Sequence, residues 1–265
     1  MHDHQHINYV MSPVYHLDLD NEKIQDAKIA LLPGDPFRSQ VIAETISKIY
    51  GTRNEKLAWK REFCTYLAEI NGKHLLITST GIGGPSASIA IDELAQLGIS
   101  TFLRVGTTGA IQEHINIGDV IITSGSVRLD GASTHYAPIE YPAVAHYEIL
   151  NALIEGAKKA KVRYHVGVTA SSDTFYPGEE RYDSFSKYVL RRFQGATKEW
   201  QKLHVLNYEM ESSTVLTLTA SMGLKGGCIT GVVNRAGRGE ITKEFLKSGE
   251  ENVVKVAIAA AECLI

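Results

Sequence analysis

The sequence predicts an α/β fold, in which helices cover both faces of a central mixed, twisted sheet. Short apolar runs alternate with helical patterns along the 265 residues, as is typical of α/β proteins. The apolar runs lack the strict polar alternation of half-exposed strands, so we expect strands that are covered on both faces. No repeat or linker is visible, and a chain of this length can form one domain. We therefore expect one three-layer α/β/α domain over residues 14–265, after a flexible tail over residues 1–13.

The expected elements follow from the apolar patterns and from the residues that flank them. Strands are expected at residues 27–34, 74–79, 101–105, 119–123, 165–170 and 228–233. Helices are expected at residues 36–49, 86–97, 144–160, 211–222 and 244–264. In the helix over 36–49, the side that faces the core is expected to carry Val41, Ile42, Thr45 and Ile46.

Composition excludes several classes of protein. The three cysteines are far apart and form no CxxC pair, so neither a disulfide framework nor a zinc knuckle is expected. The net charge is −3 and no basic stripe appears, which argues against a nucleic-acid partner. No apolar run approaches the ~20 residues that span a membrane. The start of the chain has no apolar stretch typical of a secretory signal. We expect a cytoplasmic protein without a membrane partner.

Polar residues gather where the first predicted strand ends. Open α/β sheets bind ligands at the carboxyl ends of their strands. Here the strand runs into Gly34, and Arg38 follows one helical turn later. A glycine lets a ligand approach the backbone closely, and the start of a helix favours an anion. The segment is therefore either a plain turn before a surface arginine or part of an anion site.

A second set of polar residues follows the strand predicted at 101–105. Arg104 stands inside an apolar run, and an arginine is costly to bury unless it is paired. It belongs either to a buried structural ion pair or to an anion site. Thr107 and Thr108 follow, with Gly109 after them, and offer hydroxyls and backbone N–H groups that suit phosphate. Neither a dinucleotide fingerprint nor a Walker loop is present, so a phosphate site here would depend on arginines.

A third set opens the helix predicted at 211–222. Glu211 could accept hydrogen bonds from two sugar hydroxyls, and the thioether of Met210 could pack on a sugar ring. A carboxylate at the start of a helix is also explained by its favourable interaction with the helix dipole.

Read in order, these segments resemble the uridine phosphorylase branch of the nucleoside phosphorylases. The resemblance extends from about residue 14 to the C-terminus and keeps a consistent spacing between motifs. It is carried by Pro33–Pro36 with Arg38, Arg61–Phe63, Ser79–Ser86, Phe102–Ile111, Val127–Ser133, Thr169–Gly178 and Asn207–Ser212.

The resemblance implies a role for each matching residue. The phosphate site would consist of Gly34, Arg38, Arg61, Arg104 and Thr107. The ribose site would consist of His16, Thr107, Glu209, Met210 and Glu211. The base site would consist of Thr108, Gly109, Phe175, Glu179, Arg181 and Arg235. The catalytic residues among them would be Arg104, Arg181 and Glu211.

The resemblance also implies an activity and an assembly. A pentosyltransferase of this kind cleaves uridine, and deoxyuridine as a further candidate, with inorganic phosphate to give uracil and ribose 1-phosphate. The family assembles as a hexamer, a trimer of dimers, and His16 and Arg61 would reach the site of the adjacent subunit. No cofactor is required. A potassium ion is the candidate occupant of a monovalent-cation site between subunits, lined by Glu62, Ile82 and Ser86.

Two departures from the family pattern concern the base site. Glu179 stands where the family has a glutamine, which donates as well as accepts, whereas an ionised carboxylate only accepts. It must be protonated, neutralised by Arg181 or turned away. The segment 231–235 is one residue shorter than in the family, and the glycines after Ala236 favour a mobile flap. These departures leave a nucleoside-binding paralogue with weak or altered base specificity as the alternative. Purine nucleoside phosphorylase and nucleosidase activities are the alternatives among enzymes.

Overall fold

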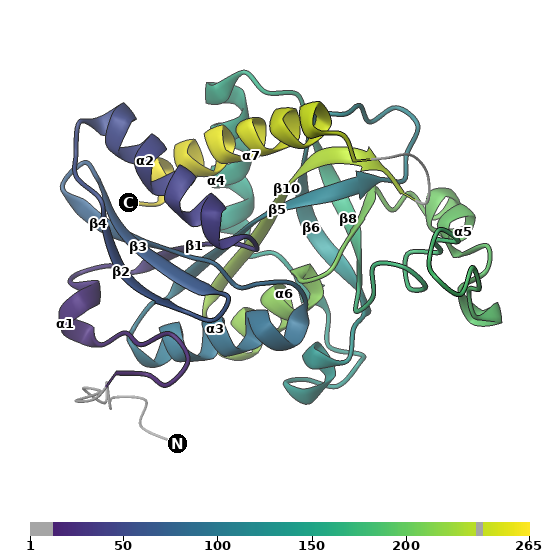
Figure 1. Ribbon diagram of the computed structural model, residues 1–265, viewed down its shortest axis with the longest axis horizontal. Helices are drawn as coiled ribbons and strands as arrows, with labels where there is room; N and C mark the ends of the chain where they lie inside the picture. The colour runs from purple at the N-terminus through teal and green to yellow at the C-terminus, as the bar shows by residue number, and fades with distance from the viewer. Residues whose placement is uncertain (1–12, 237–240) are drawn as a thin grey trace.

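A computed structural model describes residues 13–236 and 241–265 of the protein (Figure 1). The predicted tail therefore lies outside the described residues except for Pro13, and the predicted flap except for Ala236. The strands are β1 Ile29–Pro33, β2 Glu55–Lys60, β3 Phe63–Ile70, β4 Lys73–Thr78, β5 Thr101–Ala110, β6 Val120–Leu129, β7 Ala143–Val144, β8 Tyr164–Ser172, β9 Asn207–Glu209 and β10 Lys225–Arg235. The α-helices are α1 Asn21–Ile24, α2 Pro36–Tyr50, α3 Gly84–Gln96, α4 Tyr147–Ala160, α5 Ala196–Lys202, α6 Ser212–Ser221 and α7 Lys243–Leu264.

The strands form one mixed sheet, part of which closes on itself. β5 pairs in parallel with both β1 and β10, and its end pairs antiparallel with β9. β10 continues to β6, β6 to β8, and β8 returns to β9, so these five strands make a closed ring. β1, β4, β3 and β2 extend the sheet from the other side of β5. The mixed sheet confirms the predicted fold class, whereas the closure was not predicted.

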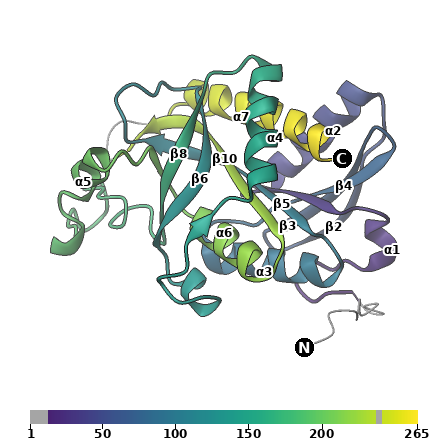
Figure 2. The same cartoon turned by 180° about the vertical axis from the view of Figure 1, so that it is seen from behind.

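Helices cover both faces of the sheet, as the sequence predicts. α2, α4 and α7 lie on one face, and α3 and α6 lie on the other (Figures 1 and 2). Successive residues of β1 serve opposite layers, because Leu31 packs with the first group and Leu32 with the second. Each is fully buried, which stabilises the fold by about 1.5–3 kcal/mol per side chain. In the described part of the chain, no helix combines the length and the hydropathy that a membrane span requires.

Helix α2 begins beside the anion site that the sequence predicts. The side chain of Asp35 caps it by accepting a hydrogen bond from the backbone N–H of Phe37 at 2.9 Å. Ile42 and Ile46 face the core, as predicted, because residues four apart share one side of a helix. Val41 was predicted to join them but is 52% exposed, since it lies one residue, about 100°, away from that side.

Two strands are longer than the apolar runs that predicted them. β5 was expected at residues 101–105 but continues to Ala110, and β6 was expected at 119–123 but continues to Leu129. The extension of β5 pairs with β10 and β9, and that of β6 pairs with β8 and β7, so both are held by backbone ladders that need no apolar side chains. Arg104 therefore stands within a strand rather than at its end. The sequence pattern also did not predict the β2–β3 hairpin, in which β2 is an edge strand with charged residues at both ends.

Candidate active site

A cavity of about 570 Å³ opens where β1 ends and the second half of β5 continues past it. Its walls come from segments far apart in the sequence, which the closed sheet brings together. The lining residues are Gly34, Asp35, Pro36, Arg38, Gly81, Ile82, Arg104, Thr107, Thr108, Gly109, Phe175, Glu179, Tyr208, Glu209, Met210, Glu211, Val233, Asn234 and Ile241. The list includes twelve of the sequence-predicted site residues.

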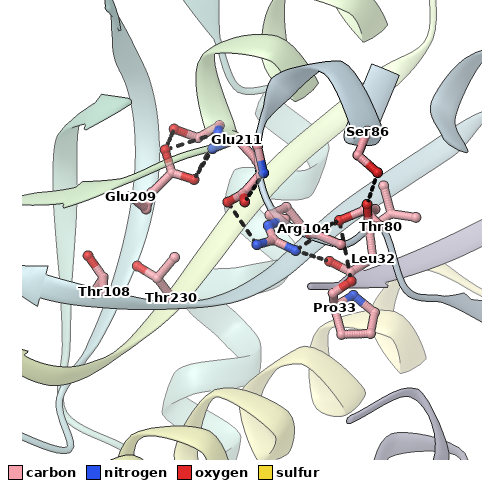
Figure 3. A network of polar contacts seen from close by, with 12 residues as sticks. Leu32, Pro33, Thr80, Ser86, Arg104, Thr108, Glu209, Glu211 and Thr230 are labelled. Carbon is pink, nitrogen blue, oxygen red and sulfur yellow. Dashed lines mark hydrogen bonds and ion pairs between the residues drawn. The ribbon is translucent and has the colours of Figure 1, made fainter. Parts of the chain in front are cut away.

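Arg104 is the buried cation of this cavity (Figure 3). Its Nη2 donates to Glu211 Oε2 at 2.8 Å, and its Nη1 donates to the carbonyl of Leu32 at 3.1 Å. Burial alone would lower the pKa of Arg104, but the carboxylates of Glu211 and Glu209 raise it. The arginine therefore forms a buried ion pair, which is one of the two alternatives that the sequence allowed. Its Nε is also buried and has no hydrogen-bond partner among the described residues.

Gly34 stands beside Arg104, and Arg38 lines the same cavity four residues after Gly34. A Cβ atom on Gly34 would lie 3.1 Å from Nη2 of Arg104 and 3.3 Å from the carbonyl oxygen of Gly81, so the position has little room for a side chain. Arg38 forms an ion pair with Glu250 of α7, a partner that sequence reasoning missed because it is 212 residues away. Its Nε is likewise buried without a partner among the described residues.

Two carboxylates stand next to each other at the start of α6. Glu211 accepts from the backbone N–H of Gly83 at 2.7 Å and from Arg104. Glu209 accepts from the backbone N–H of Glu211 at 2.8 Å and from the backbone and hydroxyl of Ser212. Burial and the nearby Glu211 raise the pKa of Glu209. Met210 lies between the two and lines the cavity.

The second half of β5 supplies the floor of the cavity. Thr107 is partly exposed there, whereas the hydroxyl of Thr108 donates to the carbonyl of Tyr208 and accepts from Nδ2 of Asn207 at 2.7 Å. Gly109 has no space for a side chain, since a Cβ would lie 2.8 Å from Oδ1 of Asn234. Thr107 is thus the threonine whose side chain is available to a ligand.

The far end of the cavity is apolar apart from one carboxyl and one guanidinium. Phe175 lines it, and Arg181 lies over the ring of Phe175 with its Cζ 4.4 Å from the centroid. Nε and Nη2 of Arg181 donate to the two carboxylate oxygens of Asp183 at 3.2 and 2.8 Å. The remaining Nη1 is buried without a partner among the described residues. Sequence reasoning missed Asp183, although its place two residues after Arg181 was a usable signal.

Glu179 lies at this end, and its side chain is not turned away from the cavity. It lines the cavity and is 5% exposed. Burial raises its pKa to about 8, opposed by Arg181 and assisted by Glu209 and Glu211. No hydrogen bond to its carboxyl is found among the residues that the structure describes.

Residues 28–265 match the model of the family described as the phosphorylase superfamily. The chain belongs to the phosphorylase superfamily. Among its relatives are three uridine phosphorylases: that of Escherichia coli is 54% identical over 96% of this chain and 99% of its own length, that of Klebsiella aerogenes is 53% identical over the same shares, and that of Haemophilus influenzae is 52% identical over 96% and 100%. The resemblance expected from the motifs is thereby confirmed.

Four residues to which the family resemblance assigns ligand contacts are absent from the lining of this cavity: Arg181, described above, and His16, Arg61 and Arg235. Nδ1 of His16 forms a hydrogen bond with the carboxylate of Glu93 at 2.6 Å. The backbone N–H of His16 also donates to this buried carboxylate, at 2.9 Å. Glu93 was not predicted from the sequence. Arg61 is exposed in the turn between β2 and β3. Arg235 is exposed, and its guanidinium donates to the backbone carbonyls of residues 112 and 113.

The three residues of the expected cation site come from two neighbouring segments. The Ser86 hydroxyl, which has one hydrogen to donate, lies within hydrogen-bond distance of both Glu62 Oε1, at 2.9 Å, and the carbonyl of Thr80. Ile82 is 76% exposed. These carboxylate and carbonyl oxygens are the type of ligand that hard cations prefer. The two segments therefore bring oxygen atoms of this type together, with Ile82 at the surface.

Proposed function

We propose that this member of the phosphorylase superfamily cleaves uridine with inorganic phosphate to give uracil and ribose 1-phosphate, and deoxyuridine in the same way. The relatives that are 52–54% identical over nearly the whole chain carry the name uridine phosphorylase. The observation that carries the proposal is the pair of buried Nε–H groups on Arg38 and Arg104 at one end of the cavity. Buried donors require acceptors, and a phosphate oxygen beside two guanidinium groups meets that need.

The cavity holds its functional groups in the order that phosphorolysis requires. Phosphate binds between Arg38 and Arg104, beside the backbone of Gly34, and is already anionic, so no general base is needed. Glu211 lies 2.8 Å from Arg104 and accepts the ribose hydroxyls, which places C1′ next to the phosphate. The ribose becomes oxocarbenium-like as the glycosidic bond breaks. The unpartnered Nη1 of Arg181 then donates to a carbonyl oxygen of the departing uracil, where negative charge develops.

We also propose an assembly in which each site is completed by a second copy of the chain. The exposed Arg61 reaches the phosphate of the adjacent subunit, and His16 reaches the 5′-hydroxyl of its ribose. The hydrogen bond between His16 Nδ1 and Glu93 supports this role, because it fixes the orientation of the imidazole ring and leaves Nε2 for a ligand. The assembly is a hexamer of three dimers, and a potassium ion is held at the dimer contact by oxygens of Glu62, Ile82 and Ser86. The proposed setting is pyrimidine salvage in the cytoplasm.

A nucleoside panel tests the activity directly. The protein is incubated with uridine, deoxyuridine, thymidine, cytidine and inosine, with and without phosphate, and release of base and of pentose 1-phosphate is followed by chromatography. Phosphate-dependent release of uracil is the expected result. Release without phosphate would indicate a nucleosidase, and release of hypoxanthine a purine enzyme. Binding of uridine without any release would indicate the nucleoside-binding paralogue.

A further inference from the structure

Three glutamates line one cavity, and their surroundings differ. Glu211 is compensated by Arg104 and by the N–H of Gly83, and Glu209 accepts three hydrogen bonds from the start of α6. Glu179 lacks such partners among the described residues, although it is 5% exposed. A buried ionised carboxylate without a partner is strongly disfavoured. The charge state of Glu179 therefore has to be explained.

Arg181 forms no hydrogen bond with Glu179 among the described residues. Its Nε and Nη2 are taken by both carboxylate oxygens of Asp183, at 3.2 and 2.8 Å, which is the bidentate geometry that guanidinium groups favour. The guanidinium of Arg181, which lowers the pKa of Glu179, is therefore already paired with another carboxylate. The sequence left three alternatives for Glu179: a protonated carboxyl, a carboxylate paired with Arg181, or a side chain turned away from the cavity. The structure disfavours the second and the third.

We propose that Glu179 reads the nucleobase as a neutral carboxyl, whose O–H donates to a carbonyl oxygen of uracil while its C=O accepts the adjacent N3–H. The proposal rests on the proposed function and adds a specificity-determining residue to it. A protonated carboxyl is planar and offers one donor and one acceptor side by side, which matches the carbonyl and imide N–H of this base. The ring of Phe175 and the side chains of Val233 and Ile241 line the same cavity and suit a flat base.

The charged groups around Glu179 act mostly in one direction. Burial and the two carboxylates on β9 and α6, Glu209 and Glu211, raise its pKa to about 8, and Arg181 opposes them. Tyr208 of β9 also faces it and remains neutral, since burial raises the pKa of that phenol to about 12. A phosphate dianion bound at the other end of the cavity adds negative charge and favours the neutral carboxyl further.

The neutral carboxyl also stabilises the leaving group. When the bond between C1′ and N1 breaks, its electron pair passes to the uracil ring, and negative charge develops on the two carbonyl oxygens. The O–H of Glu179 donates more strongly to such an oxygen, and the proton stays on Glu179. N1 of the released uracil anion is protonated afterwards by water. An ionised Glu179 would instead place a negative charge beside the departing anion.

The test compares pH profiles of the wild type and Glu179→Gln. kcat/KM for uridine is measured at saturating phosphate from about pH 6 to about pH 9.5, and the ratio of the two enzymes is taken at each pH. Ionisation of uridine and of phosphate affects both enzymes equally and cancels in the ratio. The ratio of wild type to Glu179→Gln should be constant at low pH and fall by about tenfold per pH unit once Glu179 ionises. A ratio that does not depend on pH would overturn the proposal.

A second variant should lower the pKa of Glu179 while keeping its carboxyl group. In Asp183→Asn the fork of Arg181 is released and can pair with Glu179, so the alkaline loss of kcat/KM should begin at lower pH than in the wild type. Glu180→Gln is the matched control, because the carboxylate of Glu180 caps the start of α5 instead of lining the cavity. Its pH profile should follow that of the wild type. An unshifted profile in Asp183→Asn would count against the proposal.

An infrared measurement separates this proposal from the proposed activity. At pH 6 the spectrum of the wild type minus that of Glu179→Gln should contain the C=O stretching band of a protonated carboxyl, and the subtraction removes the contribution of Glu209, whose pKa is also raised. If the protein cleaves no nucleoside but the band is present, the proposed activity fails and the neutral carboxyl stands. If uridine is cleaved and the two proteins have identical spectra, the neutral carboxyl fails and the activity stands.

Discussion

Arg104 on β5 and Glu211 at the start of α6 form an ion pair of 2.8 Å, with both side chains more than nine-tenths buried. The first is proposed to bind phosphate and the second to bind ribose. Each therefore fixes the orientation of the other, so that a change at one end is felt at the other. Several measurable consequences follow from this and the neighbouring contacts.

Removal of Arg104 should affect both catalysis and stability. In Arg104→Ala we expect kcat/KM for phosphate to fall by about 100-fold or more, because a charge-assisted donor is lost from a dry site. The free energy of unfolding should fall by about 3–5 kcal/mol, since Glu211 is left buried without its counter-ion. Arg104→Lys should restore little activity, because the planar fork is lost. Steady-state kinetics and urea denaturation measure the two effects.

The exposed Arg163 offers a control, since its side chain is 59% exposed and lies outside the cavity. Arg163→Ala should keep normal kinetics. If folded Arg104→Ala protein retained a normal phosphate dependence, the assignment of Arg104 to the phosphate site would be refuted.

The shared site can be tested by mixing two inactive variants. In Arg61→Ala the cavity keeps its own Arg38, and in Arg38→Ala the surface keeps its Arg61. A mixed dimer then contains one site with both arginines, so activity should return when subunits exchange. Activity is measured before and after co-refolding, and subunit exchange is verified by native mass spectrometry. No recovery despite verified mixed dimers, or full activity in a monomer, would contradict the shared site.

Glu93 should hold the segment that carries His16. Its carboxylate accepts from the backbone N–H groups of His16 and Leu17 and contacts Nδ1 of His16. Glu93→Ala leaves these groups without an acceptor and should lower the free energy of unfolding by about 2 kcal/mol or more. Glu93→Gln keeps an acceptor oxygen and should cost less. Equal stability of both variants and the wild type in urea denaturation would show that the contact is not required.

Glu179 should make stability depend on pH. The ordinary pKa of a glutamate, expected in the unfolded chain, is 4.5, and burial raises the pKa of Glu179 to about 8 in the folded protein. Between these values the unfolded chain releases a proton that the folded chain keeps. The stability that is present below about pH 4.5 is therefore lost as the pH rises towards 8, by about 3 kcal/mol at pH 7. Glu179→Gln should be the more stable protein at pH 8, and its unfolding free energy should vary less between pH 5 and pH 8.

Urea denaturation at a series of pH values measures this difference. Glu155→Gln serves as the comparison, because Glu155 is exposed on α4 and pairs only with Lys158 at the surface. Its curve should parallel that of the wild type. A Glu179→Gln curve parallel to the wild type as well would show that Glu179 titrates normally.

The sequence predicted most of the layered core, because buried strands and amphipathic helices leave apolar patterns. It also predicted that Gly34, Arg38 and Arg104 belong to one site, and these residues do line one cavity. It did not predict that β5 continues to Ala110, because that extension is held by backbone pairing with β10 and β9. Nor did it predict the carboxylates that position functional side chains. Glu93 and Glu250 meet His16 and Arg38 only through the folded chain, from 77 and 212 residues away.

The long strand β5 fixes the spacing of one group of cavity residues, whereas a second group lies outside the sheet. Arg104, Thr107 and Thr108 stand on one backbone ladder, so the spacing of the groups proposed to hold phosphate and sugar is fixed by the rise of about 3.3 Å per residue. Phe175, Glu179 and Arg181 stand instead on the irregular stretch between β8 and α5, whose contacts are mainly local. The residues proposed to bind the base can therefore change in evolution without displacing the residues on β5. A glutamate at position 179 is then compatible with an unchanged geometry of Arg104, Thr107 and Thr108.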